Sequence, residues 1–327
     1  MVVAKSGGDF TSVQAALNSI TDAANSKHYL VWVGPGTYDE RVQMKPFVDI
    51  EGAGELATKI TASGGGGFGA GSSVVSGASD AELRHLTVEN TGGSGTSYAI
   101  AIFNGSASPR LTNVTATGAG AENNRGVVNA GSSPTMADVT ATASGGAATF
   151  GVDNSGGSSP TMTDVSAKAS EAAYNVGIIN AGSSPTMTDV IATADGGANA
   201  RGMENSTSSS KMTNVSVSAS GGSAENTGMY NYLHSSPTIR ESVISSSGTA
   251  SRGVRSLFPD DTTSLVTIET SEVEVATGTI KAQDGYKVNV GASKLDGGTV
   301  SVGTGSAVKC AGVYNGNFTF FAGPTCP

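Results

Sequence analysis

A short motif repeats along the middle of the chain at intervals of about 25 residues. Copies begin at Gly126, Gly151, Gly177, Gly202 and Gly228. The copy at Gly177 is GIINAGSSPTMTDVIATADGG, and the earlier segment AIFNGSASPRLTNVTATGAG, from Ala101, fits the same pattern. Tandem units of this length stack so that each one contacts only its neighbours. The repeat therefore predicts a solenoid, which can hold 327 residues in one elongated unit.

Strand-like runs separated by Gly, Ser and Pro make up each copy. After a corner at Asp189, Val190, Ala192 and Ala194 share one face of a strand, because successive side chains alternate. Small residues on that face predict a narrow interior, in keeping with 46 glycines and only 6% aromatic residues. We predict an all-β right-handed parallel β-helix with coils of about 25 residues, most regular over residues 99–256.

Stacked coils place equivalent residues above one another, so each repeated position becomes a ladder. An apolar interior ladder is predicted at Leu111, Met136, Met162, Met187, Met212 and Ile239. A structural asparagine ladder is predicted at Asn104, Asn129, Asn154, Asn180, Asn205 and Asn231. A third ladder mixes Asp and Asn at Asn113, Asp138, Asp164, Asp189 and Asn214. Calcium ligands or a carboxylate pair would fit this third ladder, but turn residues that bond their own backbone explain both residue types better.

The two ends of the chain differ from the repeats. Residues 7–20 predict a turn and then a capped helix with Val13, Ala16, Leu17 and Ile20 on one apolar face, which can plug the first coil. We predict a β-helix with this cap over residues 1–289 and a C-terminal capping segment over 290–327. Cys310 and Cys326 close a short loop in that segment, and a disulfide there implies an oxidising compartment; the alternative is two free thiols.

Composition excludes several classes of function. The net charge of −9 and the lack of a Lys/Arg cluster argue against a nucleic-acid partner. No run of 18 apolar residues predicts a membrane span, and no signal peptide is recognisable at the start. The three histidines are far apart and no zinc-ligand spacing occurs, so we expect neither a metal nor a cofactor.

Charged residues near successive corners are the weak candidates for catalysis. Three pairs stand out: Glu122 with Arg125, Lys168 with Glu171, and Arg201 with Glu204. A polysaccharide lyase or hydrolase of this fold needs two carboxylates across a groove, or a basic residue near bound calcium. Solvated corner charges are the simpler interpretation of all three pairs.

Aromatic rings are the candidates for ligand binding, because a flat ring covers the apolar face of a sugar. These rings are Phe150, Tyr174, Tyr230, Tyr232 and Phe258, with corner packing as the alternative. Outward threonines at 115, 117, 140 and 142 also suggest an ice-binding array, but Lys168 and Ile191 interrupt it.

The first third of the chain resembles pectin methylesterases, in KSGGDFTSVQAALNSI (5–20), YLVWVGPGTYDERV (29–42), FVDIEGAGELATKI (47–60) and DAELRHLTVENTGGSGTSYAIAIF (80–103). This resemblance implies a pectin-lyase-like β-helix. That family hydrolyses methyl esters with two aspartates, a glutamine-bearing segment and an arginine, all downstream of this stretch. Where its Gln-Asp-Thr segment would come, this chain has TGAGAENNRG (117–126), which lacks the nucleophile.

The repeats and the segments VGASKLDGG (290–298) and VKCAGVYNGNFTFFAGPTCP (308–327) resemble bacterial extracellular β-helix proteins of unassigned function. We therefore expect a non-catalytic extracellular or cell-surface module in a bacterium. Its role would be structural, adhesive or carbohydrate-binding, with a polysaccharide or another surface protein as partner. A carbohydrate-active enzyme of the pectin-lyase-like fold is the alternative, and an ice-binding solenoid is a lesser one.

Overall fold

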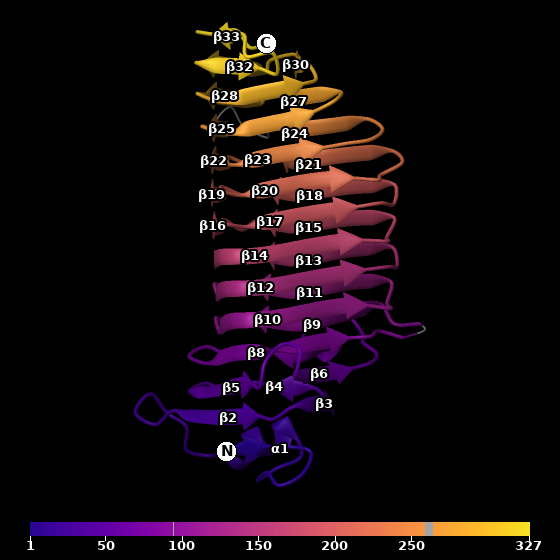
Figure 1. Ribbon diagram of the computed structural model, residues 1–327, viewed down its shortest axis with the longest axis vertical. Helices are drawn as coiled ribbons and strands as arrows, with labels where there is room; N and C mark the ends of the chain where they lie inside the picture. The colour runs from indigo at the N-terminus through magenta and orange to yellow at the C-terminus, as the bar shows by residue number, and fades with distance from the viewer. Residues whose placement is uncertain (94, 259–263) are drawn as a thin grey trace.

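The computed structural model describes residues 1–93, 95–258 and 264–327. Strands stack in one column from the N-terminus to the C-terminus (Figure 1). Almost all neighbouring strands pair in parallel, each with its equivalent in the next coil. The predicted right-handed parallel β-helix is confirmed, with coils of about 25 residues.

Two sheets run the length of the column. A 22-stranded sheet contains β1 (Val2–Val3), β2 (Tyr29–Val33), β3 (Gly36–Asp39), β5 (Val48–Gly52), β6 (Thr58–Ala62), β8 (Glu82–Asn90), β10 (Arg110–Ala119), β12 (Thr135–Ser144), β14 (Thr161–Ser170), β16 (Thr186–Thr188), β17 (Ile191–Asp195), β19 (Lys211–Thr213), β20 (Ser216–Ser220), β22 (Thr238–Arg240), β23 (Val243–Ser246), β25 (Leu265–Glu269), β26 (Glu272–Val275), β28 (Lys287–Gly291), β29 (Lys294–Gly297), β31 (Ala307–Ala311), β32 (Val313–Asn315) and β33 (Phe320–Phe321). An 11-stranded sheet contains β4 (Val42–Gln43), β7 (Ser73–Ser76), β9 (Tyr98–Gly105), β11 (Asn123–Ala130), β13 (Ala148–Ser155), β15 (Tyr174–Ala181), β18 (Asn199–Ser206), β21 (Glu225–Tyr232), β24 (Ser251–Leu257), β27 (Gly278–Ala282) and β30 (Val300–Val302).

The helix α1 (Val13–Ser19) covers the first coil, at the bottom of Figure 1. Ser12 is its N-cap and accepts a hydrogen bond from the Ala15 backbone N–H, which satisfies one donor of the first turn. Val13, Ala16 and Leu17 are buried against the core, so the predicted capping helix is confirmed. A one-turn 3₁₀ helix, η1 (Ala70–Ser72), precedes β7.

The interior is filled by ladders of equivalent side chains. The column from Leu111 through the four methionines to Ile239 is buried, with relative exposures of 0–2%. The asparagine column lies inside the 11-stranded sheet, where each side-chain amide donates to the next: Asn180 Nδ2 lies 2.9 Å from Asn205 Oδ1. The last of them, Asn231, donates to Ser256 Oγ at 3.2 Å. These bonds satisfy polar groups that no water reaches.

The glycine that begins each repeat has no room for a side chain. A Cβ on Gly177 would lie 2.5 Å from the carbonyl oxygen of Gly202, and one on Gly151 would lie 2.7 Å from that of Gly177. Neither contact is possible for a real side chain, so this position requires glycine. The third ladder has a different backbone requirement: Asp138, Asp164 and Asp189 have φ of 53–56°, the left-handed region that Asp and Asn tolerate best.

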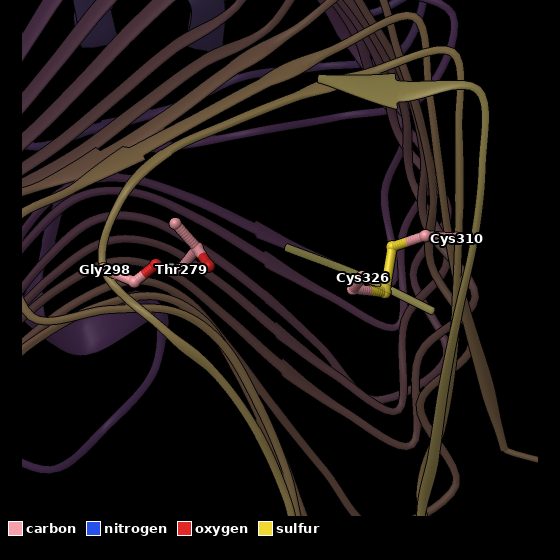
Figure 2. The surroundings of a disulfide bond; sticks show 4 residues. All are labelled: Thr279, Gly298, Cys310 and Cys326. Carbon is pink, nitrogen blue, oxygen red and sulfur yellow. Dashed lines mark hydrogen bonds between the residues drawn. A yellow bond between two sulfur atoms is a disulfide. The ribbon is translucent and has the colours of Figure 1, made fainter. Parts of the chain in front are cut away.

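At the C-terminal end, parallel pairing continues through β31 and β32, and β33 then turns back antiparallel on β32. Cys310 in β31 and Cys326 form a disulfide, with their Cα atoms 5.1 Å apart (Figure 2). On the opposite wall of the same end, the Thr279 hydroxyl donates to the Gly298 carbonyl at 3.4 Å. The disulfide ties the final segment to the last coils.

Candidate functional site

The outward face of the 11-stranded sheet carries rings, arginines and carboxylates in register. Tyr98 and Tyr174 share a column with Glu225, because β9, β11, β13, β15, β18 and β21 pair in register. The same pairing aligns Arg125 with Phe150 in a second column and Tyr230 with Arg255 in a third. We call the following set the stripe: Tyr98, Arg125, Phe150, Asp153, Tyr174, Arg201, Glu204, Glu225, Tyr230, Tyr232 and Arg255.

The N-terminal part of the stripe is built around Arg125. Its guanidinium lies 4.5 Å from the ring centroid of Phe150 and 5.0 Å from that of Tyr98. Its Nε donates to Asp153 Oδ2 at 2.8 Å, and both side chains are 10% exposed. Its Nη1 is buried and has no hydrogen-bond partner in the described structure. One donor of this arginine is therefore available to an acceptor that the chain does not supply.

Phe68 covers Arg125 from outside the repeats. Its ring centroid lies 5.3 Å from the Arg125 guanidinium, and the ring meets Tyr98 and Phe103 edge to face at 5.6 and 5.8 Å. Phe68 belongs to the glycine-rich segment 63–71, SGGGGFGAG, and is 46% exposed. This segment connects β6 to β7, and its ring lies beside the N-terminal part of the stripe.

The C-terminal part of the stripe is built around Arg201. Its guanidinium stacks 3.7 Å from the ring centroid of Tyr230, a close cation–π contact. Its Nη1 donates to Glu204 Oε2 at 2.8 Å and to the Tyr174 hydroxyl at 3.0 Å. The Tyr174 hydroxyl in turn donates to Glu204. Four groups on three adjacent coils are thereby joined.

Glu225 links this cluster to the next arginine. Its Oε2 lies 3.5 Å from Arg201 Nη2, and its Oε1 lies 2.9 Å from Arg255 Nη1. Burial alone would raise the pKa of the Glu225 carboxyl, but the hydrogen bond from Thr227 and the two arginines outweigh it and lower that pKa. Burial, reinforced by the negative charge of Glu204, raises the pKa of the Tyr174 phenol. Glu225 is thus held ionised and Tyr174 neutral.

The structure brings together most of the candidates from the sequence. Phe150 and Tyr174 lie 6.0 Å apart between centroids, and Tyr230 and Tyr232 lie 5.7 Å apart. Arg201 and Glu204 are an ion pair, with side chains 14% and 6% exposed. The interpretation of this pair as solvated corner charges is therefore wrong, because both residues lie within β18 and are covered by neighbouring rings.

Other candidates lie elsewhere. Lys168 points outward from β14 in the 22-stranded sheet, and Glu171 follows it in an exposed turn. Glu122 is exposed before β11, whereas Arg125 is part of the stripe and pairs there with Asp153 of the next coil rather than with Glu122. Phe258 is 59% exposed just after β24.

Sequence inspection missed Phe68, Tyr98, Asp153, Glu225 and Arg255. The signal that finds the last four is the coil register, since each shares a column with a residue of the repeats that was recognised. No register places Phe68, which lies in the glycine-rich segment.

Three further properties bear on what the surface can do. In residues 1–93, 95–258 and 264–327, no group of three or more His, Cys, Asp or Glu is placed to hold a metal ion. A depression of about 620 Å³ lies on the 22-stranded sheet, away from the stripe, and is lined by small residues, serines among them, with Glu274 and Asp296. No helix in the described part of the chain has the length and apolar character to span a bilayer.

The N-terminal part of the chain is similar in sequence to one known family. Residues 1–121 match the family model described as Pectinesterase. Pectinesterase 11 of Arabidopsis thaliana is 34% identical over 87 residues, and the match spans 25% of this chain and 25% of that protein. The stripe lies largely beyond residue 121, where that match ends.

Solved structures align with most of this chain at low identity. The pectin methylesterase from carrot is 14% identical, with a TM-score of 0.42 over 94% of this chain and 87% of that one. The A-module of the mannuronan C-5 epimerase AlgE4 from Azotobacter vinelandii is 15% identical, with a TM-score of 0.44 over 91% of this chain and 92% of that one.

Proposed function

We propose that this protein is an extracellular carbohydrate-binding β-helix that holds a polysaccharide along the stripe without cleaving it. The observation that carries this proposal is the array of rings and arginines on consecutive coils of one sheet. Rings cover the apolar faces of pyranoses, and neighbouring polar groups bond their hydroxyls. From β9 to β24 the array extends over six coil spacings, or about 29 Å at about 4.8 Å each, which suits a chain better than a single sugar.

The protonation states of Glu225 and Tyr174 argue against general acid catalysis by these two groups. A general acid must be able to lose a proton near the working pH, and a general base must be able to gain one. Glu225 is held as a carboxylate by Arg201, Arg255 and Thr227, and Tyr174 is held as a phenol by burial and Glu204. Neither group is poised for proton transfer near neutral pH.

An extracellular location fits the disulfide between Cys310 and Cys326, because such bonds persist in oxidising compartments. A carbohydrate-active enzyme is the second candidate function, favoured by the pectinesterase match over residues 1–121. The two candidates differ in one observable, since an enzyme changes the polymer and a binding module leaves it intact.

Affinity electrophoresis through gels that contain soluble polysaccharides tests the proposal. We expect one or more polymers to retard the wild type, and Tyr230→Ala to weaken that binding about tenfold, because the stacking surface on Arg201 is lost. Tyr314→Ala is the matched control, since Tyr314 is an exposed ring on β32, outside the stripe. Equal retardation of wild type and Tyr230→Ala would place the binding elsewhere, and new reducing ends in the polymer would favour the enzyme.

A further inference from the structure

We infer that the polysaccharide held by the stripe is uncharged and is not a polyuronide. This inference rests on the proposed carbohydrate-binding function and names its ligand class. It follows from the way the stripe distributes its charges, together with the buried arginine donors that it leaves without a partner, at Arg125, Arg201 and Arg255.

Each arginine of the stripe is matched by a carboxylate. Arg125 pairs with Asp153, Arg201 with Glu204, and Arg255 with Glu225, at 2.8, 2.8 and 2.9 Å. Three positive and three negative charges sum to zero over the set. Arg252, beside Thr227 on the adjacent coil, and Lys281, beside Arg255, lie on the same face at its C-terminal end, so the balance holds for the part of the face that carries the rings.

Burial makes it hard for a uronate to replace the carboxylate in any of these ion pairs. The side chains of Arg125 and Asp153 are each 10% exposed, and those of Arg201 and Glu204 are 14% and 6% exposed. A uronate that bound an arginine here would stand beside the carboxylate already paired with it, and the two like charges would repel. The whole chain adds to this repulsion with a net charge of −9.

An uncharged sugar can bind to the rings and to the donors that have no partner in the stripe. It needs ring surfaces for its apolar faces and donors for its hydroxyl oxygens, without displacing any carboxylate. Arg125 Nη1 is such a donor, because it is buried without a partner while Asp153 takes Nε. A hydroxyl oxygen there would complete the hydrogen bonds of Arg125.

Phe68 controls access to this donor. A Cβ added to Gly66, Gly67 or Gly71 in its segment would meet no atom within 4 Å, and none of the three adopts the left-handed conformation. Neither packing nor backbone geometry therefore requires glycine at these three positions, and what they add is conformational freedom. The Ser72 hydroxyl accepts from the Gly66 N–H and donates to the Gly67 carbonyl, at 2.7 Å each, so a sugar that reaches Arg125 Nη1 must displace Phe68 against these two bonds.

The matched test compares polymers that differ in charge. Galacturonan in its fully methyl-esterified and its de-esterified forms has one backbone with and without carboxylates; neutral glucans and alginate complete the panel. We expect the wild type to bind at least one neutral polymer and neither polyuronide, with an affinity unchanged between about 50 and 500 mM NaCl, because no ion pair forms on binding. Binding to polygalacturonate or alginate that weakens with salt would overturn the inference but keep the proposed function. Binding to none of the polymers would overturn both.

A charge switch tests the same inference through the stripe itself. Asp153→Asn keeps the shape of the side chain and leaves the charge of Arg125 unmatched, so affinity for polygalacturonate should rise about tenfold. Asp138→Asn is the matched control: it removes the same charge from the 22-stranded sheet, at a position where Asn113 and Asn214 occur in equivalent coils. Equal polygalacturonate affinity in a folded Asp153→Asn variant and the wild type would contradict the inference. Thermal melting establishes that each variant is folded, and the wild-type panel decides the question independently of them.

Discussion

The guanidinium of Arg201 lies 3.7 Å from the ring centroid of Tyr230, on the adjacent coil of the same sheet. The arginine is fixed in this position by Glu204 on its own strand and by Tyr174 on the preceding coil. A ring that stacks on such an anchored cation keeps one orientation, and little conformational entropy is lost when a ligand packs against it. This arrangement distinguishes the stripe from a surface of separate exposed tyrosines.

Glu225 should make stability depend on pH. Its pKa is lowered in the folded state, so its contribution is present above the ordinary carboxyl pKa of about 4.3 and is lost as the pH falls through the lower folded value. Glu225→Gln should therefore lower the melting temperature at pH 7 and have a much smaller effect near pH 3. Melting of both proteins across this range measures the difference. A gap of constant size would show that the charge of Glu225 contributes nothing.

Asn180→Leu should destabilise the fold by about 1–3 kcal/mol, because it leaves the amides of Asn154 and Asn205 without their partner inside the sheet. The same substitution at Asn199, on the outward face of β18, is the control and should cost much less. Denaturant melts of the two variants provide the comparison. Similar losses for both would mean that the ladder adds nothing beyond the effect of the substitution itself.

Cys326→Ser should destabilise the C-terminal end by about 3 kcal/mol, the loop-closure effect expected for a loop of this length. Reduced wild type should melt like the variant. Mass spectrometry of a non-reduced digest should show the peptides of Cys310 and Cys326 linked. Two thiols that alkylate freely in oxidised material would remove the argument for an extracellular location.

Methanol release from methylated pectin should stay at background over a broad pH range. Ester hydrolysis of the kind that the N-terminal third suggests needs a carboxylate nucleophile, a second carboxylate and amide donors for the oxyanion. Segment 117–126 supplies one carboxylate, Glu122, an exposed residue before β11. Clear release that Glu122→Gln abolishes would make the protein an esterase with Glu122 as its nucleophile.

The repeat was enough to predict the coil and the fold, and the apolar face of residues 7–20 was enough to predict the capping helix, because each of them depends on a local pattern. The position of Met187 above Met162, for example, follows from counting along the copies. Tyr174 and Tyr230 were found as aromatic residues, and Arg201 as a charged residue near a corner of the coil.

Charge partners were harder to predict, because pairing by sequence distance finds a pair within one strand, such as Arg201 and Glu204, but misses pairs between coils. Arg125 was paired with Glu122, three residues away, whereas its partner Asp153 is 28 residues away and on the next coil. Phe68 could not be placed at all, since its glycine-rich segment is not part of the repeat and its course depends on contacts with Tyr98 and Phe103. Residues that contact across coils need the register as well as the period.

Side-chain footprinting of the protein bound to its polysaccharide tests the central claim most directly. Hydroxyl-radical labelling with and without a polymer that binds should show protection of Phe68, Tyr230 and Tyr232, which line one face of the 11-stranded sheet. Phe318 and Tyr314, exposed at the C-terminal end, should label equally in both samples. Protection confined to the 22-stranded sheet or to the C-terminal end, with Tyr230 and Tyr232 unchanged, would contradict the account.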